Sequence, residues 1–148
     1  MRVEKDFKEF IALLNRHDVH YLIIGGFAYS FYAEPRYTKD IDVLIERSLE
    51  NAKKVLKSIK DFGFEDIRLD EKDFLETGQI IQLGVAPVRI DILTSVKGVD
   101  FKEFWQNRVT GRYGEISVFF ISKQDLIRCK RISGRKQDLA DIEKLEKI

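Results

Sequence analysis

Apolar side chains recur along this chain with two different periods, which separate the expected helices from the expected strands. Over residues 4–16 and 49–62 the apolar positions lie three or four apart, as on one face of an α-helix. Over residues 41–45 and 88–93 they alternate with other side chains, which is typical of a strand. Similar patterns predict strands over 21–25, 64–69, 79–83 and 116–121, short helices over 27–32 and 101–107, a hairpin bend over 111–114, and two tail helices that begin at Ser122 and are separated at Ser133-Gly134.

Strands and helices follow one another without a linker, a repeat or a low-complexity tract. This order predicts one α/β (α+β) domain over residues 1–148, in which a mixed β-sheet is flanked by helices and further helices form the C-terminal end. At 148 residues, a single domain buries about 68–70% of the surface of its unfolded chain, which is enough for one hydrophobic core.

Composition narrows the classes of protein that this chain can represent. The 44% hydrophobic and 34% charged residues describe a soluble globular protein, and a net charge of +1 provides no overall basic field for nucleic acid. The single cysteine, Cys129, cannot form an internal disulfide and suits a reducing compartment. No apolar stretch approaches the roughly 20 residues that span a bilayer, and the first residues do not resemble a signal peptide. We therefore expect a cytoplasmic protein without a membrane partner.

Two consecutive glycines, Gly25 and Gly26, end the first apolar run. A strand that turns tightly into a helix at this point leaves backbone N–H groups free to face an anion such as a phosphate. The glycines could instead simply let the helix pack closely on the strand, and the sequence leaves both interpretations open.

Three aspartates occupy two strands whose other positions are mostly apolar. Asp40 and Asp42 are two residues apart, so on a strand their side chains point to the same face. Asp91 lies within the strand predicted over 88–93, where an acid is costly to bury unless it is paired or bound to a cation. If the two strands are neighbours, the three carboxylates form a cage suited to one or two Mg²⁺ ions, whose shells phosphate oxygens and water would complete.

Each of these acids also has a purely structural interpretation. Asp40 and Asp42 could lie on a solvated strand face, and Asp91 could be a buried acid paired with an arginine or a lysine. An EF-hand is excluded, because Leu44 stands where another oxygen ligand would be needed.

The ordered set of a Gly-Gly turn, Asp-x-Asp on one strand and a lone Asp on a later strand resembles the nucleotidyltransferase superfamily, which has the DNA polymerase β-like fold. The resemblance is greatest to small prokaryotic members, the minimal nucleotidyltransferases and the abortive-infection type of toxin–antitoxin pairs. It extends from about Tyr21 to Leu145. Further matches are Arg36-Tyr-Thr-Lys-Asp before the Asp pair and, in the tail, Asp125-Leu-Ile-Arg-Cys-Lys130 and Gly134-Arg135-Lys136-Gln-Asp138.

One position departs from the pattern of that superfamily. Many members have Gly-Ser at the turn, and the serine hydroxyl contacts the triphosphate, whereas this chain has Gly26 there. The small-protein branch often has Gly-Gly. The departure shifts the expected phosphate contact to backbone N–H groups, with help from Ser30 one helical turn further on.

The resemblance implies a metal-dependent transfer of a nucleoside monophosphate from an NTP to a hydroxyl acceptor, with release of pyrophosphate. Asp40 and Asp42 are expected to hold Mg²⁺ or Mn²⁺ on the triphosphate, and Asp91 to bind a second ion with them. Nearby cations would neutralise the charge that builds on the departing pyrophosphate. The residues expected to contact the triphosphate are Gly25, Gly26, Ser30, Lys130, Arg135 and Arg36, the last because it shares strand parity with Asp40 and Asp42.

The resemblance leaves three classes of acceptor open: a hydroxyl on a partner protein, the 3′ end of a tRNA, or a small molecule. It also suggests a cognate toxin or antitoxin as a protein partner. Rival functions use parts of the same pattern. A glycosyltransferase also uses Asp-x-Asp, although such folds generally need a longer chain, and a non-catalytic module could retain the fold. An RNA-binding module would depend on the basic residues between 128 and 136, which could equally be a solvated helix face.

Overall fold

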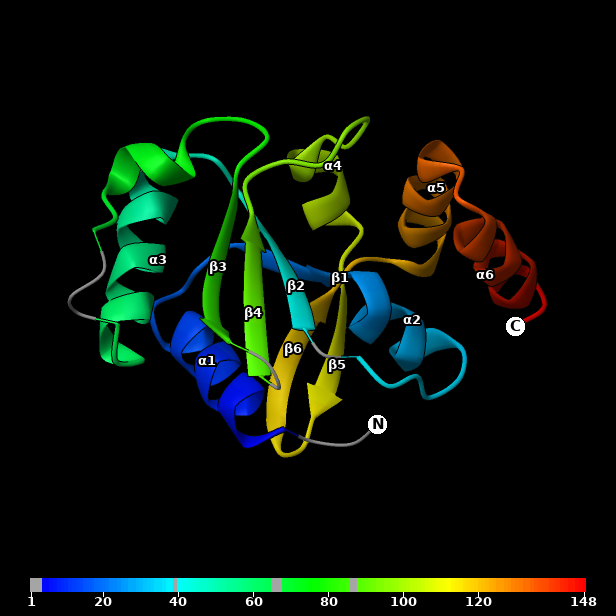
Figure 1. Ribbon diagram of the computed structural model, residues 1–148, viewed down its shortest axis with the longest axis horizontal. Helices are drawn as coiled ribbons and strands as arrows, with labels where there is room; N and C mark the ends of the chain where they lie inside the picture. The colour runs from blue at the N-terminus through cyan, green and yellow to red at the C-terminus, as the bar shows by residue number, and fades with distance from the viewer. Residues whose placement is uncertain (1–3, 39, 65–67, 86–87) are drawn as a thin grey trace.

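A six-stranded sheet forms the centre of the computed structural model, which describes residues 4–38, 40–64, 68–85 and 88–148 (Figure 1). The strands are β1 (Tyr21–Ile24), β2 (Asp40–Ile45), β3 (Ile80–Val85), β4 (Val88–Leu93), β5 (Val109–Tyr113) and β6 (Ile116–Phe120). Their order in the sheet is β3-β4-β2-β1-β6-β5. β2 is parallel to β4 and β1 to β6, whereas the other neighbouring pairs are antiparallel, so the predicted mixed sheet is confirmed.

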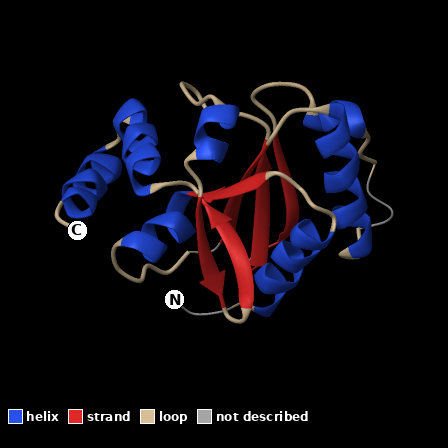
Figure 2. Ribbon diagram, turned by 180° about the vertical axis from the view of Figure 1, so that it is seen from behind, coloured by secondary structure: helices blue, strands red, loops and turns tan. Residues whose placement is uncertain are grey.

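Helices surround this sheet, as the view from behind shows most clearly (Figure 2). They are α1 (Lys5–Arg16), α2 (Gly25–Tyr32), α3 (Leu49–Asp61), the 3₁₀ helix η1 (Glu71–Phe74), α4 (Phe101–Gln106), α5 (Lys123–Ser133) and α6 (Lys136–Glu146). The α5–α6 pair lies beside α2, at the opposite end of the molecule from α3 (Figure 1). None of the described helices has the length and apolar character that crossing a bilayer requires.

The predicted tail helices form as the sequence indicates, because local signals set their ends. Ser122 Oγ accepts a hydrogen bond from the backbone N–H of Asp125 at 3.1 Å and so caps the start of α5. Gly134, with φ of +67°, ends that helix in the left-handed conformation that glycine adopts without strain. The apolar faces of α5 and α6 join the core through Leu126, Ile142 and Leu145.

The strand predicted over residues 64–69 is wrong for the residues that the structure describes. Phe64, Arg68 and Leu69 belong to no strand, and residues 65–67 lie outside the described residues. The polar segment that follows folds into η1, which a reciprocal capping box between Asp70 and Asp73 starts. These local hydrogen bonds satisfy the backbone without a neighbouring strand.

The predicted hairpin before β6 is confirmed, but the bounds of its bend, 111–114, are wrong, because β5 continues to Tyr113 and the turn comes at Gly114 and Glu115. Gly111 is important for side-chain packing against β5 and does not form a turn. A Cβ atom at this position would lie 2.6 Å from the ring of Phe31, which stacks on Phe120 with a centroid distance of 4.1 Å. The glycine therefore makes room for an aromatic stack against the sheet.

Candidate active site

The three aspartates come together on two adjacent parallel strands. In the register of β2 and β4, Asp42 lies opposite Asp91 and Asp40 lies opposite Arg89. Each aspartate offers a carboxylate oxygen, and the three oxygens lie within 4.8 Å of one another. The neighbouring strands that the sequence-based hypothesis required are therefore present, and we call Asp40, Asp42 and Asp91 the acid triad.

Electrostatic repulsion within the acid triad is large. Burial, followed by the charges of Asp40 and Asp91, raises the pKa of Asp42 to about 7, against the opposing effect of Arg89. Burial is also the main cause of the raised pKa of Asp91, whose side chain is almost fully enclosed. Asp91 Oδ1 is buried and forms no hydrogen bond among the described residues, although Arg89 Nε lies 3.3 Å away as an ion-pair partner. A divalent cation would satisfy this oxygen and remove the repulsion, so the donor set fits Mg²⁺ or Mn²⁺.

Arg89 is a charged member of this site that the sequence-based interpretation did not name. Its Nη2 lies 2.6 Å from Asp40 Oδ2 and 3.4 Å from Asp91 Oδ2. The alternative in which Asp91 is paired with an arginine is therefore also present in the structure. The signal was strand parity, because Arg89 is two residues before Asp91 and so shares its face of β4.

The glycine turn lies directly against the acid triad. β1 ends at Ile24, opposite Asp42 in the register, and α2 begins at Gly25. Gly25 has φ of +67°, and a Cβ atom on it would lie 2.3 Å from Asp42 Oδ2. The backbone can approach the carboxylate this closely only because residue 25 is a glycine. The turn thus places the N-terminus of a helix, which attracts anions, beside the three carboxylates.

Gly26 makes room for Thr38, which explains the missing serine at the turn. A Cβ atom at Gly26 would lie 2.4 Å from Thr38 Cγ2, which is too close for two carbon atoms. Any side chain at position 26 therefore competes with Thr38 for the same space.

We expect Gly26→Ser to destabilise the fold by about 1–3 kcal/mol, because it overpacks this contact. Thr38→Ala removes the methyl group that the new Cβ would meet. The double variant Gly26→Ser/Thr38→Ala should therefore recover most of the loss, and urea unfolding of all three variants measures the coupling. Additive losses in the double variant would show that the two positions do not share this space.

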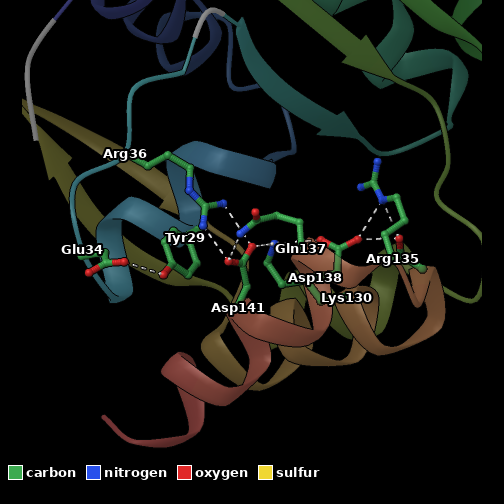
Figure 3. A network of polar contacts seen from close by, with 9 residues as sticks. Tyr29, Glu34, Arg36, Lys130, Arg135, Gln137, Asp138 and Asp141 are labelled. Atoms are coloured by element: carbon green, nitrogen blue, oxygen red, sulfur yellow. Dashed lines mark hydrogen bonds and ion pairs between the residues drawn. The ribbon is translucent and has the colours of Figure 1, made fainter.

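The basic residues of the tail belong to a second polar group, the tail cluster, shown in Figure 3. Lys130 Nζ donates to Asp138 Oδ1 at 3.2 Å and to Asp141 Oδ2 at 2.9 Å. Arg36 binds the two oxygens of Asp141 at 3.0 and 2.6 Å, and its guanidinium lies 3.9 Å from the ring centroid of Tyr29. We define the tail cluster as Arg36, Lys130, Arg135, Asp138 and Asp141.

The central pair of the tail cluster, Lys130 and Asp141, is buried and helps to hold the fold together. Asp141 is 1% exposed and Lys130 is 8% exposed. Burial alone would raise the pKa of Asp141, but hydrogen bonds from Arg36, Lys130 and Gln137 outweigh it and hold this pKa well below its ordinary value. The cluster therefore ties α5 and α6 to the segment that follows α2.

The structure corrects one argument about Arg36 and places the other predicted triphosphate contacts. β2 begins at Asp40, so Arg36 is not on a strand and its proposed parity with the acids does not apply. Ser30 Oγ accepts a hydrogen bond from the N–H of Arg36 at 3.2 Å. Arg135 donates from Nε to Asp138 at 2.9 Å, yet 80% of its side chain is exposed. Lys130 and Arg36 are thus already paired with acids, and Arg135 is the most accessible of the three.

A mixed sheet with three carboxylates on adjacent strands, beside a glycine turn that opens a helix, defines the nucleotidyltransferase class of fold and site. The chain belongs to the family described as nucleotidyltransferase of unknown function (DUF6036), whose model matches residues 1–147. A comparison with curated proteins gave no match.

Two similar solved structures support the same fold. The lincosamide antibiotic adenylyltransferase LnuA, bound to lincomycin, aligns with a TM-score of 0.61 and 18% identity, over 97% of this chain and 96% of the relative. An antigenic nucleotidyltransferase-like protein from Paracoccidioides brasiliensis aligns with a TM-score of 0.57 and 15% identity, over 95% of this chain and 74% of the relative.

Proposed function

We propose that this protein transfers a nucleoside monophosphate from an NTP to a hydroxyl acceptor and releases pyrophosphate. The observation that carries this proposal is the acid triad, whose carboxylate oxygens lie within 4.8 Å of one another beside the turn at Gly25. Bound Mg²⁺ or Mn²⁺ would polarise the phosphate and lower the pKa of the acceptor hydroxyl. The membership in a nucleotidyltransferase family supports the same reaction class.

Each of the predicted site residues then has a defined role in the reaction. Asp40 and Asp42 hold a metal-bound triphosphate, and Asp91 orients the attacking hydroxyl together with them. The N–H groups of Gly25 and Gly26 face the phosphates, and Ser30, one helical turn further on, provides an additional hydroxyl contact. Arg135 neutralises charge on the leaving pyrophosphate, while Lys130 and Arg36 reach it only by exchanging Asp141 for a phosphate oxygen.

The direct test is a labelling experiment with each α-labelled NTP, Mg²⁺ or Mn²⁺, and a lysate of the source cells. We expect label to appear in one acceptor with the unmodified protein and with Asp6→Asn, a control that changes an exposed acid on α1. We expect no label with Asp40→Asn. Label that persists with Asp40→Asn would contradict the role of the acid triad, and label that never appears while NTP binds would favour a non-catalytic module.

The nature of the labelled acceptor decides between three classes. A hydroxyl on a partner protein, including a cognate toxin or antitoxin, leaves a labelled polypeptide, and a tRNA 3′ end leaves a labelled RNA. A small molecule is the third class, and one structural relative is an antibiotic adenylyltransferase. We propose that the reaction takes place in the cytoplasm, where NTP and free Mg²⁺ are available.

Arg135→Ala tests the proposed contact with the triphosphate. A charge-assisted contact is worth about 1.5–3 kcal/mol, so the affinity for NTP should fall at least about tenfold while that for NMP changes little. Arg131→Ala is the matched control, because Arg131 is an exposed arginine on α5 that pairs with Glu146.

Three outcomes of this titration have different meanings. An unchanged NTP affinity in Arg135→Ala would show that Arg135 is a solvated surface residue that does not contact the triphosphate. A loss of affinity for a short RNA, with a shallower salt dependence and unchanged NTP binding, would instead indicate an RNA-binding patch. An equal loss of NTP affinity in both variants would point to the general positive charge of the C-terminal tail and not to Arg135 in particular.

A further inference from the structure

Arg89 occupies a position between two members of the acid triad. It lies opposite Asp40 in the register of β2 and β4 and shares a face with Asp91. One guanidinium nitrogen, Nη2, is 2.6 Å from Asp40 Oδ2 and 3.4 Å from Asp91 Oδ2, and Nε is 3.3 Å from Asp91 Oδ1. The cationic edge of the side chain therefore fills the space between these two carboxylates.

The three acids are consequently not equivalent. Asp40 and Asp91 share the charge of Arg89, whereas Asp42 forms no ion pair within the described part of the chain. Asp42 also lies against the glycine turn at Gly25, on the side from which an anionic ligand would approach. Asp42 is thus the carboxylate of the acid triad that Arg89 leaves unpaired and available to a metal.

Charge counting indicates how many divalent ions this site can accept. Three carboxylates and one guanidinium give a formal charge of −2, which one divalent ion neutralises. A second ion shared by Asp40 and Asp91 would need the space that Nη2 occupies. It would also lie within a few ångströms of a positive charge, and the repulsion would persist although 40% of the Arg89 side chain is exposed to screening solvent.

We propose that Arg89 is the second cation of this site. Its guanidinium holds Asp40 and Asp91 where a second divalent ion would otherwise bind, so the nucleotide-free protein takes one divalent ion, shared by Asp40 and Asp42. Arg89 is in this sense a positioning residue, which acts through the carboxylates. The inference rests on the proposed metal-dependent function and specifies the cation content of its site.

Counting bound Mn²⁺ tests this proposal without reference to activity. Mn²⁺ is titrated into the nucleotide-free protein, and the free ion is measured by electron paramagnetic resonance. We expect one ion per chain for the unmodified protein and two for Arg89→Met, which keeps the length of the side chain but removes its charge. The first ion should bind roughly tenfold more tightly to Arg89→Met, because a nearby positive charge has gone.

Two control variants separate the charge of Arg89 from other effects. Arg89→Lys keeps the positive charge and should still bind one ion, although it loses the planar fork of the guanidinium. Arg112→Met removes an arginine from β5, at the far edge of the sheet from β4, and should bind one ion like the unmodified protein. Circular dichroism verifies that each variant is folded, and Arg89→Gln takes the place of Arg89→Met if that variant does not fold.

The Arg89 role is overturned if the unmodified protein binds two ions, if the uncharged variant still binds one, or if Arg89→Lys or Arg112→Met binds two. These outcomes leave the proposed nucleotidyl transfer intact. Failure of the function has a different signature: no Mn²⁺ binds the unmodified protein, or Asp42→Asn binds it equally well. Either result removes the metal site and the Arg89 role together.

Discussion

Asp42→Asn is expected to lower the rate of nucleotidyl transfer by about three orders of magnitude, because it removes a ligand from the metal on which several kcal/mol of transition-state stabilisation depends. The same change should leave the fold intact, since Asn has nearly the same shape. The rate is measured as pyrophosphate release with saturating NTP and the acceptor identified by labelling. Asp6→Asn, the exposed control on α1, should keep the full rate.

The same substitution should stabilise the metal-free protein. The pKa of Asp42 is raised in the folded state to about 7, so between about pH 4 and that value the folded protein binds more protons than the unfolded chain. Protonated Asp42 carries no repulsion, so its contribution to the free energy of unfolding is fully present below about pH 4 and is lost as the pH rises through 7. At pH 8, Asp42→Asn should therefore gain about 1–2 kcal/mol after allowance for solvent screening.

Urea unfolding with and without Mg²⁺ measures this effect. Added Mg²⁺ should stabilise the unmodified protein and have little effect on Asp42→Asn, because a ligand stabilises only the state that binds it. A variant that is less stable than the unmodified protein at pH 8 in the absence of metal would contradict the repulsion within the acid triad. A variant that responds fully to Mg²⁺ would contradict the assignment of Asp42 as a metal ligand.

Asp141→Ala should destabilise the protein by about 3–5 kcal/mol, the range found when one partner of a buried ion pair is removed. Asp141 is 1% exposed and accepts hydrogen bonds from Arg36 and Lys130. The substitution leaves the buried ammonium of Lys130 with a single acidic partner, Asp138. Thermal or urea unfolding gives the magnitude.

Glu146→Ala is the matched control for this prediction. Glu146 also pairs with an arginine across α5 and α6, Arg131, but both side chains are more than half exposed. Its removal should therefore cost no more than about 1 kcal/mol. Equal losses in the two variants would show that burial does not set the strength of the tail cluster.

The pH dependence provides a second measurement on the tail cluster. The pKa of Asp141 is held below its ordinary value, so its contribution to stability is present above the ordinary pKa of an aspartate and is lost as the pH falls below it. This dependence is opposite in sign to that of Asp42. Asp141→Ala should flatten the acid limb of the stability curve, and Asp42→Asn should flatten the limb between about pH 4 and pH 7.

Short-range features of this molecule followed from the sequence because their energies depend on close neighbours in the chain. Alternation predicted β2 and β4 and placed the two carboxylates of Asp40 and Asp42 on one face. The cap at Ser122 and the break at Gly134 predicted the tail helices. Where local signals competed, prediction was wrong, as at Gly111, whose role depends on Phe31, a residue distant in the chain.

Only the tertiary structure decided which distant side chains meet. Arg36 and Asp141 are 105 residues apart in the chain, and Arg89 is 49 residues from Asp40. Such pairs depend on strand register and helix docking, which the burial of the whole core selects and no local pattern encodes. The sequence by itself therefore determined that three acids and a glycine turn exist on suitable elements. The tertiary structure decided that Arg89 stands between two of the acids, and that Lys130 pairs with acids of its own tail, because both outcomes depend on which elements become neighbours.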